Sequence, residues 1–273
     1  MTIKKTNIKS IRANNRRFPF LSLRKGRKWY YLLGVLFVTL LVLLVSPVSI
    51  FQDPAKLKKH TPEQTALMIF RQKEAQDSHE SYRIQKKFIP LRQIHPLLRE
   101  AVQLSEDASF YAHDGFDFDE MEKAIALNIK RKKMIRGAST ISQQLIKNLY
   151  LSVSKNPFRK LTEALLTIRL EQRVSKDRIL ELYLNLIEWG DGIFGIEMAA
   201  KIYFKETAMT LTPAHAVLLA AMLPMPLHVN PLYPSVWLKR RAQRLLKELY
   251  IKHRLSNQEY QDAKKQIGTM NDM

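Results

Sequence analysis

The chain has 273 residues, of which 46% are hydrophobic and 26% are charged, and it contains no cysteine. This composition supports one sizeable hydrophobic core, and the lack of cysteine excludes disulfides, thiolate nucleophiles and cysteine metal sites. The formal net charge of +20 favours nucleic acid or an anionic membrane as a partner. Half of that charge lies in residues 1–28, which contain ten Lys or Arg and no acid.

An uncharged segment of 24 residues, from Trp29 to Gln52, follows this basic N-terminus. A helix needs about 20 apolar residues to cross a bilayer, whereas the apolar region of a cleaved signal peptide, the alternative, has only about 7–15. The aromatic residues at 29–31 match an interfacial belt, and the basic residues before them predict a cytoplasmic N-terminus. We therefore predict a cytoplasmic tail (1–28), an uncleaved transmembrane helix (29–51) and an extracytoplasmic remainder. That location argues against nucleic acid as a partner.

The next segment, 52–87, is polar and contains one predicted helix, with Thr61 as its N-cap. We interpret this segment as a stalk or collar that carries the catalytic part away from the bilayer. From Phe88 onward, apolar residues recur at helical spacing and strand-like alternation is scarce. We therefore predict an all-α, mostly helical domain over 88–235, followed by a basic C-terminal helix and a polar tail over 236–273.

Three glycines in GDGIFG, at positions 190, 192 and 195, match the dinucleotide-binding pattern G-x-G-x-x-G. A helical stretch precedes them where that motif requires a strand, so the geometry that brings a helix end to a pyrophosphate is missing. We interpret the segment as a flexible turn between two helices.

Two adjacent acids, Glu106 and Asp107, begin the stretch EDASFYAHDGFD, which also contains Phe110 and His113. A carboxylate beside aromatic, histidine and further acidic residues is typical of a site and less typical of an ordinary surface. This stretch is the first candidate for catalytic chemistry.

A second stretch, RGASTISQQLIKNLY (136–150), has the pattern of a capping box formed by Thr140 and Gln143. At 100° per residue, one helix face carries a hydroxyl, two amides and an ammonium group, from Thr140, Gln144, Lys147 and Asn148. Such a face, which has no acid, suits an oxygen-rich anionic ligand. A solvated helix face is the alternative.

A third stretch, RKLTE, places Arg159 and Glu163 four residues apart, with Lys160 beside them. Alone, this spacing indicates an exposed ion pair on a helix, worth about 0.3–0.5 kcal/mol. A fourth stretch is SKDRILELYLN, in which we interpret Glu181, Tyr183 and Asn185 as packing residues. In this order and spacing, the four stretches resemble the family 51 glycosyltransferases that polymerise peptidoglycan. The resemblance covers about residues 90–234. Since only 39 residues follow Pro234, it is to the monofunctional members and not to bifunctional penicillin-binding proteins.

The resemblance implies a lysozyme-like glycosyltransferase domain with a small hydrophobic jaw lobe near the membrane, which composition places around IKRKKMIR (129–136). It implies that lipid-linked disaccharide-peptide (lipid II) is polymerised into β-1,4-linked glycan, with inversion and release of a polyprenyl diphosphate. The implied partners are lipid II, the growing glycan, the membrane and other cell-wall synthesis and division proteins. The implied location is the cytoplasmic (inner) membrane, crossed once, with the catalytic domain in the periplasm.

By the same resemblance, Glu106 is the base that takes a proton from the attacking sugar hydroxyl, and Glu163 is a second catalytic glutamate at the donor side or the diphosphate. A diphosphate leaves as a stable anion, so it needs positive charge more than a proton. The implied substrate-binding residues are Asp107, Phe110, His113, Thr140, Gln144, Lys147, Asn148, Arg159 and Lys160. No cofactor is required, although a divalent cation (Mg or Mn) at the diphosphate stays open. We expect both glutamates to face one solvent-accessible site.

Two alternatives stay open at this point. A lytic muramidase-like enzyme on the same fold would cut glycan, but it has no use for a group of cations around a diphosphate. A non-catalytic scaffold for cell-wall synthesis would not need Glu106 and Glu163. The cations and the two glutamates therefore favour a synthetic enzyme.

Overall fold

A computed structural model describes residues 28–39, 53–132, 137–151 and 159–270, and it divides the chain into two units, Met1–Ser46 and Pro47–Met273. In the first unit, residues 28–39 form a helix with exposed side chains. Within the described ranges, no helix has both the length and the apolar character that crossing a membrane requires. Part of the predicted anchor (40–51) lies outside the described residues, so the transmembrane helix stays a prediction.

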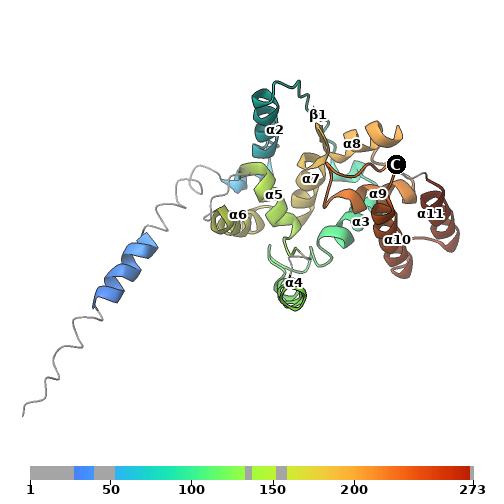
Figure 1. Cartoon of the computed structure of the whole chain (residues 1–273). Helices are drawn as coiled ribbons and strands as arrows, with labels where there is room; N and C mark the ends of the chain where they lie inside the picture. The colour runs from blue at the N-terminus through green and yellow to red at the C-terminus, as the bar shows by residue number, and fades with distance from the viewer. Residues whose placement is uncertain (1–27, 40–52, 133–136, 152–158, 271–273) are drawn as a thin grey trace, which may run out of the picture. The chain divides into compact units, whose positions relative to one another are not determined.

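The second unit is mostly helical, as the sequence predicts (Figure 1). Its longer helices are α2 (Ala66–Asp77), α3 (Pro96–Glu106), α4 (Phe118–Arg131), α5 (Ile141–Tyr150), α6 (Arg159–Arg173), α7 (Lys176–Leu186), α9 (Pro213–Met222), α10 (Val236–Ile251) and α11 (Asn257–Thr269). Its short helical segments are η1 (Pro54–Lys58), η2 (Leu91–Gln93), α8 (Ile196–Ala199) and the π-helical η3 (Ala200–Phe204). Three short strands, β1 (Gln85–Lys86), β2 (Glu188–Gly190) and β3 (Ile193–Phe194), form a sheet in the order β1-β3-β2.

Helix α9 lies at the centre of the core. Its sequence PAHAVLLAAM is apolar on nearly every side, and Ala214 and residues 216–222 are buried. A helix that is hydrophobic all round must be covered on all sides, and α3, α10 and α11 pack against it. Since α3 and α10 also contact each other, this packing brings the C-terminal end of α3 close to α10.

Helix α5 packs against α2, α6 and α7. The predicted capping box is confirmed: the side chain of Thr140 accepts a hydrogen bond from Gln143 N, and the side chain of Gln143 accepts one from Thr140 N. The cap fixes the start of the helix at Ile141. The buried face of α5 includes Ile141 and Leu145. Of the polar face predicted for this helix, Lys147 is exposed and Gln144 and Asn148 are half-buried, whereas Thr140 is buried.

Residues 53–87 belong to the folded body and do not form a separate stalk, whereas the alternative of a collar stays a prediction. Met68 of α2 is fully buried, and β1 pairs in parallel with β3. The predicted N-cap is also wrong: α2 begins at Ala66, and the hydroxyl of Thr65 accepts a hydrogen bond from Met68 N at 3.1 Å. The hydroxyl of Thr61 instead accepts a hydrogen bond from Arg178 Nη2 at 2.8 Å.

The segment GDGIFG connects α7 and α8, as predicted, but it forms the β2–β3 hairpin instead of a flexible turn, and Gly195 is the N-cap of α8. Gly192 and Gly195 have φ values of 68° and 82°, which glycine adopts at little cost. A Cβ atom at either position would lie 2.6 Å from a backbone oxygen, that of Arg83 or Asn185. Close backbone packing therefore requires these glycines.

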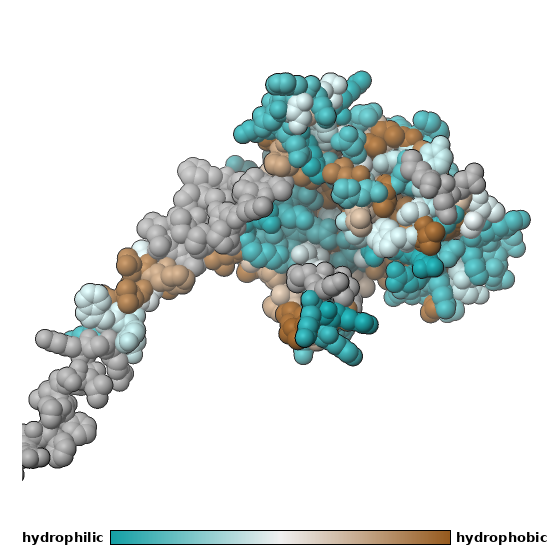
Figure 2. Space-filling model, in the orientation of Figure 1, coloured by the Kyte–Doolittle hydropathy of each residue, from teal (hydrophilic) through white to brown (hydrophobic). Residues whose placement is uncertain are grey.

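Helix α4 stands apart from the other helices of the unit (Figure 1). The side chain of Asp117 caps its first turn by accepting a hydrogen bond from Glu120 N at 2.8 Å. Phe118, Ile125 and Ile129 are each more than half exposed, and Figure 2 shows hydrophobic and hydrophilic residues side by side on this helix. Of the segment predicted to form the jaw, residues 133–136 lie outside the described part.

Candidate active site

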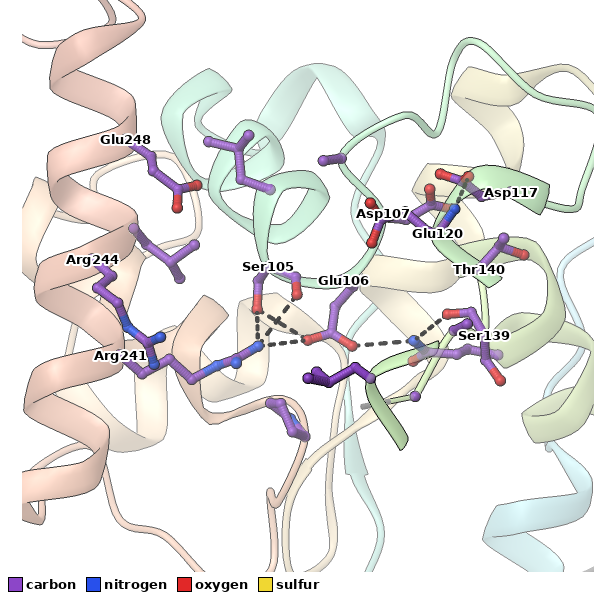
Figure 3. A pocket seen from close by; sticks show the side chains of 18 residues that line it. Ser105, Glu106, Asp107, Asp117, Glu120, Ser139, Thr140, Arg241, Arg244 and Glu248 are labelled. Atoms are coloured by element: carbon purple, nitrogen blue, oxygen red, sulfur yellow. Dashed lines mark hydrogen bonds and ion pairs between the residues drawn. The ribbon is translucent and has the colours of Figure 1, made fainter. Parts of the chain in front are cut away.

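A cavity of about 740 Å³ lies between the end of α3, the start of α4, residues 137–144 and helix α10 (Figure 3). Its charged lining consists of Glu106, Asp107, Asp117, Glu120, Arg241, Arg244 and Glu248. Thr140 and Gln144, both predicted as site residues, also line it. The cavity thus brings together the first two of the sequence stretches singled out above.

Glu106, the last residue of α3, is held in this cavity from two sides (Figure 3). Gln144 Nε2 donates a hydrogen bond to Glu106 Oε2 at 3.1 Å. On the other side, Arg241 Nη2 lies 3.5 Å from Glu106 Oε1. The side chain is 10% exposed, so the carboxylate is oriented by protein groups and still reaches the cavity.

Arg241 of α10 is a site residue that the sequence did not reveal. Its Nη2 atom donates hydrogen bonds to Ser105 O at 3.2 Å and to Ser105 Oγ at 2.8 Å. Ser105 Oγ lies 3.0 Å from both Glu106 Oε1 and Ala220 O, and its single proton serves one of these acceptors at a time. Burial lowers the pKa of Arg241, and the charge of Glu106 opposes this shift. Arg241 thus contacts both Ser105 and the carboxylate of Glu106.

Tyr183, which the sequence assigned to packing, also orients a site residue. Its hydroxyl donates a hydrogen bond to Gln144 Oε1 at 3.0 Å. With its oxygen occupied, the amide of Gln144 turns its nitrogen towards Glu106. Tyr183 is buried, and burial together with the charges of Glu106 and Asp107 raises the pKa of Tyr183 well above its ordinary value. The phenol therefore stays protonated and remains a donor.

Asp107 ties the loop after α3 to the start of α5. Its buried carboxylate accepts hydrogen bonds from Ile141 N at 3.0 Å and from His113 Nε2 at 2.9 Å. Because His113 Nδ1 accepts a hydrogen bond from Gly115 N at 3.1 Å, the proton of a neutral imidazole lies on Nε2. Thr140 Oγ1 closes the arrangement by donating to Gly115 O at 2.7 Å.

These contacts make Asp107, His113 and Thr140 supports of the cavity, and the substrate binding implied for them stays a prediction. Phe110 is 1% exposed and lies in the core, with Lys176 Nζ 4.5 Å from the centroid of its ring. This burial favours a structural part for Phe110, and the substrate contact implied for it stays a prediction.

Glu163 does not open into the cavity of Glu106. Its side chain is 4% exposed and forms a salt bridge with Lys160, instead of the i, i+4 pair with Arg159 that the spacing predicts. The expectation that both carboxylates face one solvent-accessible site is therefore not met. Glu163 is buried, whereas Lys160 is exposed, because α6 turns Thr162, Glu163 and Leu166 towards the body and leaves Leu161 and Leu165 partly exposed.

Lys147 provides the link between the two glutamates. The residue is exposed as a whole, but protein groups around its ammonium remove water from it and lower the pKa of Lys147. Glu163 and Glu106 raise this pKa, whereas Arg159 and Lys160 lower it further. Lys147 therefore lies within electrostatic range of both carboxylates. Asn148, half-buried, follows it on α5.

The described residues contain no group of three or more His, Asp or Glu that could hold a metal ion. The carboxylate implied at the diphosphate, Glu163, is already neutralised by Lys160. The cavity of Glu106 is itself lined by five acids and two arginines, so the cations implied at the diphosphate lie on α5 and α6 and not in its lining.

A family model described as Transglycosylase matches residues 72–250, which is more than half of the chain. The chain belongs to the transglycosylase family. The matched range includes every predicted site residue and extends beyond the predicted domain (88–235) at both ends. This extension agrees with the packing of α2 and α10 into the body.

Three proteins named biosynthetic peptidoglycan transglycosylase are among its similar relatives. The protein of Nitrosospira multiformis is 39% identical over 220 residues, which cover 81% of this chain and 95% of the relative. The proteins of Chromobacterium violaceum and Aromatoleum aromaticum are 45% and 47% identical, over 62% and 60% of this chain and 74% and 72% of the relatives. The similarity to the transglycosylase family thus runs through most of the folded body.

Proposed function

We propose that this transglycosylase-family chain is a peptidoglycan glycosyltransferase, which joins lipid-linked disaccharide-peptide units (lipid II) into a glycan strand. The names of its relatives support this function. The observation that carries the proposal is the carboxylate of Glu106, which Gln144 and Arg241 orient at the wall of an open cavity.

Glu106 acts as the general base. A sugar hydroxyl is a weak nucleophile at neutral pH, and a positioned carboxylate that takes its proton accelerates attack by about 10²–10⁴-fold. Each carboxylate oxygen has two lone pairs, so Oε2 can accept the substrate proton while Gln144 occupies its other lone pair. One attack at the anomeric carbon inverts its configuration, from an α-linked diphosphate to a β-1,4-linked glycan.

The diphosphate leaving group binds the cations on α5 and α6. Lys147 lies on α5, and Arg159 and Lys160 begin α6, which packs against α5, so an anionic leaving group would meet cations from both helices. Glu163 holds Lys160 in this group through its salt bridge. Its role in this proposal is to organise the cations and not to accept a proton.

A divalent cation at the diphosphate would supply further positive charge, and no step of this proposal depends on one. A time course of precursor consumption with and without chelator measures its contribution. We expect most of the rate to remain in chelator, because the cations of the chain already face the leaving group.

The choice of substrate distinguishes the proposed synthetic enzyme from the alternative, a lytic muramidase-like enzyme. We expect the full chain to convert purified lipid-linked precursor into polymer and to release no soluble fragments from purified sacculi. Fragments from sacculi without polymer from the precursor would instead support the lytic alternative. If neither substrate reacts, the scaffold alternative gains support.

We further propose a single-pass location in the inner membrane, with the N-terminus in the cytoplasm. The uncharged segment 29–52 and the exposed apolar residues of α4 support this location, with α4 as the membrane-proximal jaw. The chain has no cysteine, so single cysteines report topology cleanly. In spheroplasts, a membrane-impermeant maleimide should label the Lys252→Cys variant, whereas the Lys5→Cys variant should react only after lysis; the reverse result would contradict this location.

A further inference from the structure

A second hollow, of about 560 Å³, lies between α10 and α11 and carries strong positive charge. Its lining consists of Arg240, Gln243, Arg244, Lys247, Tyr260 and Lys264. Four of these six residues are cations, and none is an acid. We call this hollow the basic groove.

The charges of the basic groove are not explained by the stability of the helices. Arg240, Arg244 and Lys247 occupy one face of α10, at positions i, i+4 and i+7, and like charges at i, i+4 destabilise a helix. Two arginines elsewhere in the body do pair with acids, Arg71 with Glu188 and Arg178 with Glu181. A ligand with negative charge would relieve the repulsion in the groove.

Tyr260 contributes an ordered aromatic surface to the basic groove. Its ring stacks on Tyr250 with centroids 4.5 Å apart and an angle of 16° between the planes. Lys264 Nζ lies 5.9 Å from the centroid of the Tyr260 ring. Because stacking fixes the ring, Tyr260 can contact a polar, partly apolar ligand such as a peptide at low conformational cost.

The basic groove adjoins the cavity of Glu106. Arg244 lines both hollows, so a ligand that extends from Glu106 past Arg244 enters the groove. This shared lining residue favours a ligand that comes from the active site over a lipid headgroup.

We propose that the basic groove binds the carboxylates of the peptides carried by the glycan strand at the active site. The inference rests on the proposed function, because that function supplies a substrate whose sugar units bear peptides. Each ion pair formed at an exposed groove is weak. We therefore expect the groove to help retain the glycan strand between successive additions of disaccharide units and not to accelerate each addition.

The test uses the full chain in detergent and the double variant Lys247→Gln/Lys264→Gln, which removes one cation from each side of the groove and spares Arg244. The matched control is Lys73→Gln/Lys252→Gln, which removes two exposed lysines outside both hollows. Binding is measured with soluble glycan fragments that carry their peptides and with the same fragments after removal of the peptides.

We expect the groove variant to bind peptide-bearing fragments about three- to tenfold more weakly than the wild type and the control do. Binding of peptide-free fragments should be equal in all three proteins. With lipid-linked precursor, the groove variant should begin polymerisation at the wild-type rate and release shorter strands.

Equal binding of peptide-bearing fragments by the groove variant and the wild type would overturn the inference. The inference would also be overturned if vesicles with anionic lipid bound the wild type but not the groove variant, since that result assigns the groove to lipid headgroups. A failure of the proposed function can be told apart from a failure of this inference. If the proposed function is wrong, the wild-type chain makes no polymer, whereas fragment binding can be measured without turnover.

Discussion

Glu106 and Glu163 are the same residue type in opposite surroundings, and the difference supports the separate roles proposed for them. Glu106 ends a helix at an open cavity and keeps lone pairs free for a substrate proton. Glu163 is buried on α6, paired with Lys160, and exposes 4% of its side chain. A base must reach the proton that it removes, so only Glu106 meets this requirement.

Arg241 should affect turnover more than substrate affinity. It contacts Ser105 and Glu106, so the Arg241→Met change releases the base from its fixed position. Misplacement of a catalytic group by about 1 Å can cost 10²-fold in rate, and we expect kcat to fall by about 10- to 100-fold with little change in KM. Initial rates at several precursor concentrations give both constants.

The conservative change at the same position separates positioning from folding. Arg241→Lys keeps the charge near Glu106 and should recover part of kcat. Arg254→Met, which loses an exposed salt bridge to Glu100, should have wild-type kinetics. A rise in KM without a fall in kcat for Arg241→Met would show that Arg241 binds substrate and does not position the base.

At the scale of elements, the start of α5 and the loop after α3 form one hydrogen-bonded unit. Asp107 accepts from Ile141 N, and Thr140 both caps α5 and donates to Gly115 O. Each contact joins residues about 25 to 35 positions apart, and it sets the distance between Glu106 and the polar face of α5. The two stretches thus act as one site because of these few bonds.

Removing the Thr140 hydroxyl should loosen that unit. Thr140→Ala loses the N-cap of α5 and leaves the buried Gly115 carbonyl without its donor, so we expect a loss of about 1–3 kcal/mol in the free energy of unfolding. Urea denaturation measures the change. Thr140→Ser keeps the hydroxyl and should stay within about 0.5 kcal/mol of the wild type. Equal losses in both variants would mean that the methyl group, and not the hydrogen bonds, stabilises this region.

At the scale of the whole molecule, local signals in the sequence predicted local structure well. The α5 capping box follows from Thr140 and Gln143 three residues apart, and the helical class follows from apolar spacing. The site stretches were found because each is continuous in sequence. Their order along the chain carried the resemblance to the family.

The errors fall where contacts between distant residues decide the structure. Arg241 acts on a glutamate 135 positions earlier, and only the packing of α3 and α10 brings them together. Strands of two or three residues, such as β1 and β2, are too short to show alternation. The supposed stalk joins the body through such a strand and through α2, whose apolar face is short.

Glu197 links three separate segments and should make the fold sensitive to acid. Burial raises the pKa of Glu197, but hydrogen bonds from Ala208 N, Lys201 and Lys87 outweigh burial and hold the pKa below its ordinary value of 4.5. A lowered pKa in the folded state means stability that is present above about pH 4.5 and is lost as the pH falls through the folded value. In the Glu197→Gln variant, the free energy of unfolding should therefore fall less steeply as the pH is lowered.

Urea denaturation of the full chain at about pH 6 and about pH 3 tests this expectation. The variant should be less stable than the wild type at the higher pH and should approach it at the lower pH. Glu122→Gln, which changes an exposed glutamate of α4, should keep the wild-type dependence. A difference between Glu197→Gln and the wild type that is the same at both pH values would contradict the account.

The most direct measurement of the central claim is the polymerisation rate of the Glu106→Gln variant with purified lipid-linked precursor. Gln has nearly the same shape and cannot take a proton, so we expect a loss of about 10²–10⁴-fold with the fold intact by circular dichroism. Glu100→Gln, six residues earlier in α3, should keep the wild-type rate. A Glu106→Gln variant that polymerises at the wild-type rate would contradict the assignment of Glu106 as the base.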